Sequence, residues 1–365
     1  MKIAEVISLF EGFAPQTYQE SYDNSGLQVG DPEDEVRGAL LTLDITEAVV
    51  DEAIAKGCNL IIAHHPVIFS GIKSLSGQNY VQRIVQKAIK NDVNLFAVHT
   101  NLDNMRNGVN EKIASKLGLI NTRILAPTNG NLYKLQTYVP VAQSDMVLDA
   151  LFAAGAGEIG KYSECSFSVS GNGTFKGDEN TKPFIGTPGG KREMVEEIKL
   201  EVVVPAHLKN KVQSAMLSAH PYEEVAHEWI LLQNLNPEIG AGVVGELENP
   251  VSEIEFLNLL KTNLKAKIVR HTALSGAPVR KVALCGGSGS FLLNNAINTQ
   301  ADIFISADFK YHQFFDAEGK IVIADIGHYE TEQFTVEIFD AILKKKNVTF
   351  AVLFSTLDTN PIKYF

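Results

Sequence analysis

The chain has 365 residues, of which 45% are hydrophobic, and these values predict a globular protein of two or three domains. No apolar run reaches the ~20 residues that span a bilayer, and the three cysteines lie outside any paired motif, so we expect a cytoplasmic protein without a membrane partner or disulfide framework. The net charge of −11 argues against binding to nucleic acid, because no cationic excess can displace counterions from phosphates.

Residues 1–125 alternate apolar runs with helix-like stretches, which is typical of a parallel sheet flanked by helices. In this part we predict strands at 38–46, 58–63 and 94–100 and helices at 47–57, 80–92 and 107–118. A glycine closes the first and the last of these helices.

Residues 126–240 show a different pattern, in the order βαββαβ, which is that of a ferredoxin-like α+β domain. The predicted elements are strands at 133–141, 164–175, 195–205 and 223–232 and helices at 143–157 and 207–220. The polar, glycine-rich stretch that follows the second of these strands is too long for an ordinary hairpin connection, and we predict a mobile loop there.

Residues 241–365 return to the alternating α/β pattern, with helices at 253–264, 291–300 and 331–346 and strands at 281–286, 301–308 and 319–327. The segment 53–65 aligns without gaps to 296–308, and this alignment places His65 on Asp308. We therefore expect 1–125 and 241–365 to form one discontinuous α/β core of two pseudo-symmetric, duplicated halves. Coincidence between two generic αβ units is the alternative, since the identity between the segments is low.

Ligand-type side chains follow several of these strands, at the sheet edge where α/β proteins collect ligands and catalytic groups. His64 and His65 come directly after one strand, and Asp103 follows another. His328 and Glu332 stand four residues apart at a helix start, so both project from one face. Each motif alone has a plainer explanation: an inert surface pair, a turn cap, or a carboxylate that stabilises a helix N-terminus. Their shared position at strand exits favours one site.

Three imidazoles and two carboxylates suit two divalent ions of zinc, iron, cobalt or manganese. Two-metal hydrolytic sites hold such ions ~3.5–4 Å apart and lower the pKa of a shared water. Glu332 has two oxygens and is the residue that we expect to bridge both ions.

Several other residues are secondary candidates. We expect His99 to orient a ligand or, like His312, to move protons in catalysis, in which Glu332 takes part by holding the ions. Lys310 could bind phosphate, as could the turn 285–290, although that turn lacks the ending of a P-loop. We also expect a tight turn at the edge of the site, formed by Asp23, Asn24 and Gly26.

The sequence resembles the NIF-three-like family, also called GTP cyclohydrolase I type 2 homologues, in the stretches DNSGLQVG, AHHPVIF, HTNLDN, GGSGS, ADFKYH and GHYETE. These stretches span both outer segments. The resemblance implies a di-metal site with His64, His65, Asp103, His328 and Glu332 as ligands. One departure is mild: the family's usual TGD before KYH reads Ser306-Ala307-Asp308.

The middle segment is similar to the inserted PII- and CutA-type domain of longer bacterial members. The stretches that carry this likeness are PVAQSDMVLDALFAAGAG and SAHPYEEVAHEW. The family resemblance also implies a homohexameric toroid whose metal sites line an internal cavity.

Two functions follow from this site. The first is a metal-dependent hydrolase that acts on a nucleotide or similar small molecule through a metal-bridging hydroxide; for the family, attack on the purine of GTP is the proposed reaction. The second is a non-enzymatic metal-binding scaffold or regulator that uses the insert as a sensor or interaction module. Nothing in the residues themselves specifies guanine.

Overall fold

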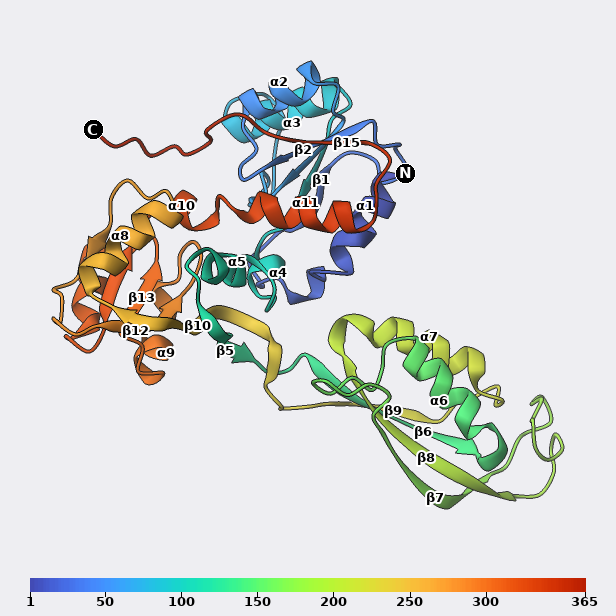
Figure 1. The fold of residues 1–365 in the computed structure, drawn as a ribbon. Coiled ribbons are helices and arrows are strands. Elements are labelled where there is room, and N and C mark those ends of the chain that lie inside the picture. Colours follow the sequence, from blue (N-terminus) through green and yellow to red (C-terminus); the bar gives the residue numbers. More distant parts are fainter. The chain divides into compact units, whose positions relative to one another are not determined.

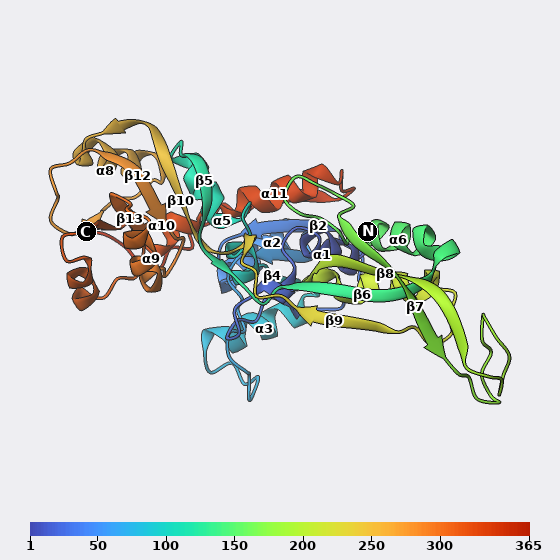
Figure 2. The same ribbon diagram turned by 90° about the horizontal axis from the view of Figure 1, so that it is seen from below.

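The computed structural model describes residues 1–365 and divides the chain into two compact units. Unit 1 combines Met1–Pro127 with Pro237–Phe365, and unit 2 is Thr128–Asn236. Figures 1 and 2 show the elements of each unit from two directions. None of the helices has the length and apolar character needed to cross a membrane.

Unit 1 contains two sheets and most of the helices. Its first sheet consists of β1 (Gly26–Val29), β2 (Gly38–Thr42), β3 (Leu60–Ala63), β4 (Asn94–Ala97) and β15 (Ala351–Phe354). Its second sheet consists of β5 (Ile120–Thr128), β10 (Asn236–Val251), β11 (Arg270–His271), β12 (Val279–Leu284), β13 (Ile303–Ser306) and β14 (Val322–Asp325). The α-helices are α1 (Ile3–Glu11), α2 (Glu47–Ala55), α3 (Tyr80–Lys90), α4 (Thr100–Asp103), α5 (Val109–Lys116), α8 (Glu253–Asn263), α9 (Leu293–Asn298), α10 (His328–Glu332) and α11 (Thr335–Lys345). Short 3-10 helices are η1 (Gln16–Tyr18), η4 (Ser290–Leu292) and η5 (Tyr311–Ala317).

The first sheet has the order β1–β4–β3–β2–β15, with β1 antiparallel and the other strands parallel. Successive side chains of a strand point to opposite faces, so neighbouring residues enter different cores. Leu40 packs with α2 and α3, whereas Leu41 belongs to the core of α1 and α11. Figure 1 shows these helix pairs on opposite sides of the sheet. Because both faces are covered, β2, β3 and β4 are buried along their whole length.

The second sheet has the order β11–β14–β13–β12–β10–β5, and its β12, β13 and β14 are parallel. One face shares a core with α8, α11 and the face of the first sheet that packs against α1 and α11, so a layer of helices separates the two sheets. The opposite face packs against α9 and η5. The parallel strands of both sheets deliver their carboxyl ends to the ligand-type residues described below.

The mixed α/β architecture with several sheets was predicted, but the two halves exchange strands. β5 precedes the middle segment and joins the second sheet, and β15 follows α11 and pairs with β2 of the first sheet. No strand was predicted after the 331–346 helix, so β15 was missed. The predicted turn at Gly26 is instead the start of β1, which is stabilised by pairing with β4, a contact no local pattern encodes.

Unit 2 contains β6 (Leu132–Pro140), α6 (Ser144–Ala153), β7 (Ser166–Phe175), β8 (Glu193–Pro205), α7 (Lys209–Ala219) and β9 (His227–Leu231), with short 3-10 turns η2 (Val141–Gln143) and η3 (Ala206–Leu208). The sheet order is β7–β8–β6–β9 and every pairing is antiparallel. Leu135, Leu200 and Val202 pack beneath α6 and α7. The other face of this sheet carries no helix of unit 2, as Figure 2 shows.

Candidate metal centre

His64 and His65 leave the carboxyl end of β3 and are held by backbone hydrogen bonds. Both amide nitrogens donate to the carbonyl of Leu43, at 3.1 and 3.0 Å. The side chain of His64 is fully buried, whereas that of His65 is 22% exposed. The adjacent residues therefore place two imidazole rings 4.9 Å apart at one strand end.

Four imidazoles at this site have the same hydrogen-bonding arrangement. In each, Nδ1 lies against an oxygen that can only accept: His64 on Val98 O at 2.8 Å, His65 on Asp44 Oδ1 at 2.7 Å, His99 on Asp23 Oδ1 at 2.8 Å, and His328 on Asp308 Oδ2 at 2.6 Å. Each Nδ1 therefore donates, which leaves the Nε2 lone pair of a neutral ring as the free ligand atom. Histidines that bind metals are oriented in this way by carboxylates and carbonyls.

Helix α10 supplies two further groups from the second half of unit 1. His328 and Glu332 lie one helical turn apart, and the Nε2 of His328 is 3.0 Å from Glu332 Oε2. The same carboxylate oxygen lies 2.9 Å from His65 Nε2. Gly327, which precedes the helix, has φ +100, a conformation that glycine adopts without strain.

Asp103 reaches the same point from the end of α4, directly after β4. Its Oδ1 lies 3.5 Å from His64 Nε2, and Glu332 Oε1 lies 3.9 Å from that same nitrogen. Ligand atoms within 4.8 Å of one another form three overlapping groups: His64, Asp103 and Glu332; His65, His328 and Glu332; and His64, His65 and His99. Glu332 belongs to two of these groups, and its two oxygens face different nitrogens.

The buried polar atoms of this cluster fit a cation. His64 Nε2 and Asp103 Oδ1 are buried without any hydrogen-bond partner, and the buried Glu332 Oε2 meets only the imidazole nitrogens of His65 and His328. An unsatisfied buried polar atom costs about 1–3 kcal/mol, and more if charged, so two such atoms at one point demand an explanation. Nitrogen and carboxylate ligands converging on a common space are what divalent transition metals bind, so the residues present fit metal ions.

The protonation states of the metal-free protein reflect the same cluster. Burial lowers the pKa of His64 to about 4, so this ring is neutral. Burial also acts to lower the pKa of His65, but the hydrogen-bonded Asp44 and the Glu332 carboxylate outweigh it and raise the value to about 10. The charges of Glu332 and Asp308 likewise outweigh burial at His328 and raise its pKa to about 11.

The two carboxylates respond in opposite directions. Burial and the charge of Glu332 raise the pKa of Asp103. At Glu332 burial opposes ionisation, but His328 and the other imidazoles hold the pKa well below its usual range. Without metal, protons on His65 and His328 thus supply the positive charge that the carboxylates require.

A cavity of about 440 Å³ opens beside these ligands. Three large aromatic side chains line it while remaining open to solvent: Tyr22, Phe69 and Phe291 are 63%, 51% and 69% exposed. Polar lining comes from Glu20, Asn104, Asn110 and Ser288. The cavity thus joins a cluster of metal-ligand atoms to aromatic faces.

The structure brings together the five predicted ligands and places His99 beside them. His99 is held by Asp23, whose pKa is lowered by this contact and by Thr100 although burial opposes the shift. Predicted site residue His312 lies elsewhere: it is exposed, its ring contacts Tyr311 and Phe315, and it does not line the cavity. The 3-10 helix η5 turns it away from the strand exit. Lys310 is also exposed and does not line the cavity.

Asp44 is the residue that the sequence analysis missed. It follows β2 by two positions, and its carboxylate holds His65 while accepting a hydrogen bond from Thr359 Oγ1 at 2.6 Å. A carboxylate just after a buried strand was the available signal. Asp308, which also orients a ligand, has φ +60, a conformation that Asp tolerates better than most residues. The side-chain amide of Asn24 donates to Ile68 O.

The glycine-rich turn after β12 packs against the carboxylate of Glu332. A Cβ on Gly287 would lie 2.3 Å from Glu332 Oε1 and 3.2 Å from His328 Nε2, and its φ is +60. Gly286 N donates to Asn110 Oδ1 at 2.8 Å. Close approach of backbone to Glu332 thus explains the glycine at this position.

The fold and the site define an α/β protein with a histidine and carboxylate cluster that could bind metal ions. The family model Duf34/NIF3 (NGG1p interacting factor 3) matches residues 1–361. The chain therefore belongs to the DUF34/NIF3 family.

Relatives resemble the whole chain. A Halalkalibacterium halodurans protein named GTP cyclohydrolase 1 type 2 homolog is 39% identical over 373 residues, covering 100% of both chains. A Bacillus subtilis protein of the same name is 38% identical over 365 residues, covering 99% of this chain and 98% of its own. Among solved structures, a Bacillus cereus protein related to NIF3 has a TM-score of 0.87 at 38% identity, covering 100% of this chain and 99% of that one. A Staphylococcus aureus protein gives 0.79 at 32% identity, with the same coverage.

Proposed function

We propose that the protein is a metal-dependent hydrolase with a dinuclear site, acting on a nucleotide or similar small molecule. The observation that carries this proposal is the convergence of buried ligand atoms of His64, Asp103 and Glu332 beside a cavity, with His64 Nε2 and Asp103 Oδ1 lacking any hydrogen-bond partner. A structural site would be closed on all sides, whereas catalytic sites keep a position open to water and substrate. This cluster has such an opening.

Each of two of the ligand groups could hold one ion. His65, His328 and Glu332 would hold one ion, and His64, Asp103 and Glu332 the other. The shared carboxylate would make the sites a pair rather than two separate centres. When bound, two such ions would lower the pKa of a water and stabilise the negative charge that develops on the substrate when this water attacks it.

The chain's own residues would handle protons and orient the substrate. His99 donates its Nδ1 proton to Asp23, so its Nε2 is left to accept a proton next to the ligand cluster. Tyr22, Phe69 and Phe291 offer aromatic faces on which a planar heterocycle could stack. A purine has such a ring, and the relatives' names refer to a GTP cyclohydrolase.

We extend the proposal to the architecture. Each sheet of unit 1 contains three parallel strands with an antiparallel strand beside the last of them: β2, β3 and β4 with β1 in the first sheet, and β12, β13 and β14 with β11 in the second. This repeated pattern supports a duplicated core of 1–125 and 241–365. The order β7–β8–β6–β9 and two helices on one face support a ferredoxin-like, PII/CutA-like insert at 126–240. A homohexameric toroid in the cytoplasm rests on the family resemblance alone.

Metal analysis of the full-length protein tests the site. We expect about two ions per chain in the wild type, and a sharp fall in the double variant His65→Ala, Glu332→Ala. The matched control is His271→Ala, which removes an exposed imidazole outside the cavity and should retain the metal. Full metal content in the double variant would overturn the ligand assignment.

Turnover tests the reaction. Loss of purine absorbance from GTP should require the metal-loaded protein and stop on chelation. Full metal content without turnover of any nucleotide would overturn the hydrolase proposal and favour a metal-binding scaffold or regulator.

A further inference from the structure

Unit 2 contains a cavity of about 660 Å³ that is unrelated to the metal centre. It lies on the face of the sheet that α6 and α7 leave uncovered, and its floor is formed by β7 and β8. Its walls come from the connection after β7 and from the segment before β9. All of its lining residues belong to unit 2, so the cavity is complete within that unit.

A buried carboxylate forms the floor of this cavity. Glu197 is only 8% exposed, because the alternation of β8 turns it away from the core residue Leu200 and onto the helix-free face. A Cβ on Gly173 would lie 2.0 Å from Glu197 Oε2, so the glycine leaves the space that the carboxylate occupies. Burying a charge is costly unless it is paired.

The pairing inside the protein is incomplete. Glu197 Oε1 accepts a hydrogen bond from Tyr222 Oη at 2.8 Å, and this is a neutral donor. Burial and the contact with Glu197 raise the pKa of Tyr222, so its hydroxyl keeps the proton that it donates. The nearby ammonium of Lys199 is used elsewhere, 2.7 Å from Glu201 Oε1. No basic side chain forms an ion pair with Glu197.

Aromatic rings stand around the carboxylate. The ring of Tyr222 lies 5.7 Å from that of Phe175 and 6.4 Å from that of Phe184, measured between centroids. Tyr222 N donates to His220 Nδ1 at 3.1 Å, and the other nitrogen of His220 donates to Tyr138 O at 2.9 Å. These hydrogen bonds fix the backbone of Tyr222, whose ring lies against both phenylalanines, and aromatic faces attract cations.

The charges of the lining favour the same class of ligand. Glu223 and Glu224 add two exposed carboxylates, against the ammonium of Lys199, already paired, and of Lys176 at the solvent-exposed rim. An anionic ligand would meet Glu197 without a counter-charge, and a purely apolar ligand would leave it buried and unpaired. A cation resolves both difficulties.

We propose that this cavity binds a small organic cation, a guanidinium or primary ammonium compound with an apolar body, whose head group pairs with Glu197 between Phe175, Phe184 and Tyr222. The planar guanidinium suits the site well, since it can donate to a carboxylate and stack on aromatic faces at the same time. The proposal is independent of the proposed function of the metal centre.

Calorimetric titration of the full-length protein with butylguanidinium tests this inference, with butylurea as a neutral probe of the same shape. We expect binding of butylguanidinium alone, and an affinity roughly tenfold lower or worse in Glu197→Gln. Glutamine can still accept from Tyr222, so the fold should persist. The matched control is Glu196→Gln, which alters the neighbouring carboxylate on the opposite face of β8 and should bind as the wild type does.

A second variant separates the aromatic contribution. Phe184 is largely exposed, so Phe184→Ala should leave the melting temperature nearly unchanged while weakening the binding of butylguanidinium. Absence of binding to the wild type at millimolar probe, equal binding of butylurea, or equal affinity of the wild type and Glu197→Gln would each overturn the proposal.

Discussion

His65 Nε2 and His328 Nε2 face each other at 3.4 Å, although the two residues are 263 positions apart in the chain. His65 follows β3 of the first sheet, and His328 is the first residue of α10, which follows β14 of the second sheet. Two nitrogen lone pairs repel at this distance, so a proton or a metal ion has to lie near them. The contact joins the two halves of unit 1, and four predictions follow from it and its surroundings.

Glu332→Gln should reduce metal content more than any other single change at the site. The carboxylate belongs to both of the ligand groups that we assign to the two ions, whereas His64, His65 and His328 each belong to only one of these two groups. We expect nearly complete loss of metal in Glu332→Gln and the loss of about one ion per chain in His328→Ala, measured by elemental analysis. Equal loss in the two variants would contradict a shared carboxylate.

Thr359→Val should weaken metal binding from a distance. Thr359 Oγ1 donates to Asp44 Oδ2 at 2.6 Å, and Asp44 in turn holds His65. Removal of such a supporting contact costs on the order of 10–100-fold in metal affinity. Competition with a chelator of known affinity measures this change, and Asp44→Asn should show a larger effect in the same assay.

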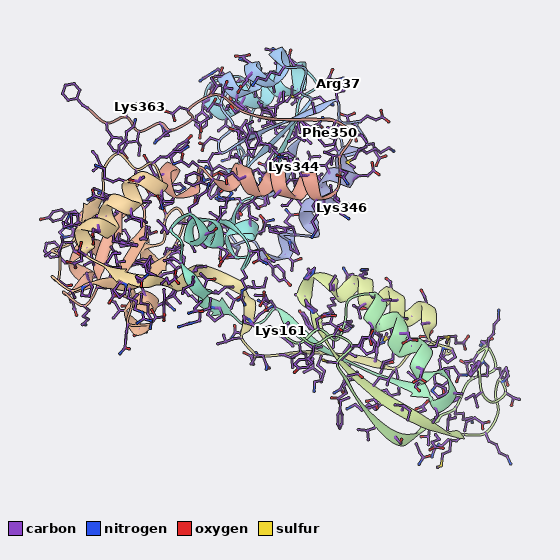
Figure 3. All side chains as sticks on the ribbon, in the orientation of Figure 1. Arg37, Lys161, Lys344, Lys346, Phe350 and Lys363 are labelled. Atoms are coloured by element: carbon purple, nitrogen blue, oxygen red, sulfur yellow. The ribbon has the colours of Figure 1, made fainter.

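The C-terminal segment that carries Thr359 is held beside Asp44 by further contacts. Asn360 Nδ2 donates to Glu330 Oε1 of α10 at 3.2 Å, so the segment contacts elements of both halves. Lys363, labelled in Figure 3, lies further along it and pairs with Asp358 at 3.0 Å. If chelator competition gave wild-type affinity for Thr359→Val, the segment would have no role in positioning His65.

Gly287→Ala should displace Glu332. The added methyl would lie 2.3 Å from Glu332 Oε1, and the residue would have to adopt φ +60. We expect a loss of stability of roughly 1–3 kcal/mol from the strained backbone and the contact together. The same substitution at Gly130, where a Cβ meets nothing within 4 Å at φ +74, controls for the backbone conformation alone. Metal content should fall only at Gly287.

Glu52→Gln should loosen the C-terminal segment from α2. Although burial opposes ionisation, hydrogen bonds with Lys56, Ser355 and Thr356 lower the pKa of Glu52 to about 2. Because this value lies below the ordinary 4.5, the carboxylate stabilises the folded state above pH 4.5 and loses that effect as the pH falls toward 2.

The difference in unfolding free energy between Glu52→Gln and the wild type should change over the same pH range, from 4.5 down to about 2. We expect about 1 kcal/mol at neutral pH, seen as a shift of the denaturant midpoint, shrinking as the pH falls below 4.5. A difference that stayed constant down to pH 2 would show that the charge of Glu52 contributes nothing.

Local patterns predicted those parts of the fold that local physics controls. β3 and β4 were predicted because their buried residues form short apolar runs, of four residues in β3 and of three in β4 after Asn94. β1 and β15 were missed, since each is a short edge strand whose stability comes from pairing with β4 or β2. Asp44 was missed for a related reason: its role depends on His65 and Thr359, which no spacing connects to it.

The sequence by itself determined the chemistry of the site: imidazoles and carboxylates placed where buried strands end, which favours divalent metals. Only the tertiary structure decided which of them meet. His99 and His312 look alike as strand-exit histidines, yet the first is held by Asp23 beside the ligands and the second is turned to solvent on η5. Metal binding depends on distances of a few ångströms, and such distances arise from packing between β3, α4 and α10, which are remote in the chain.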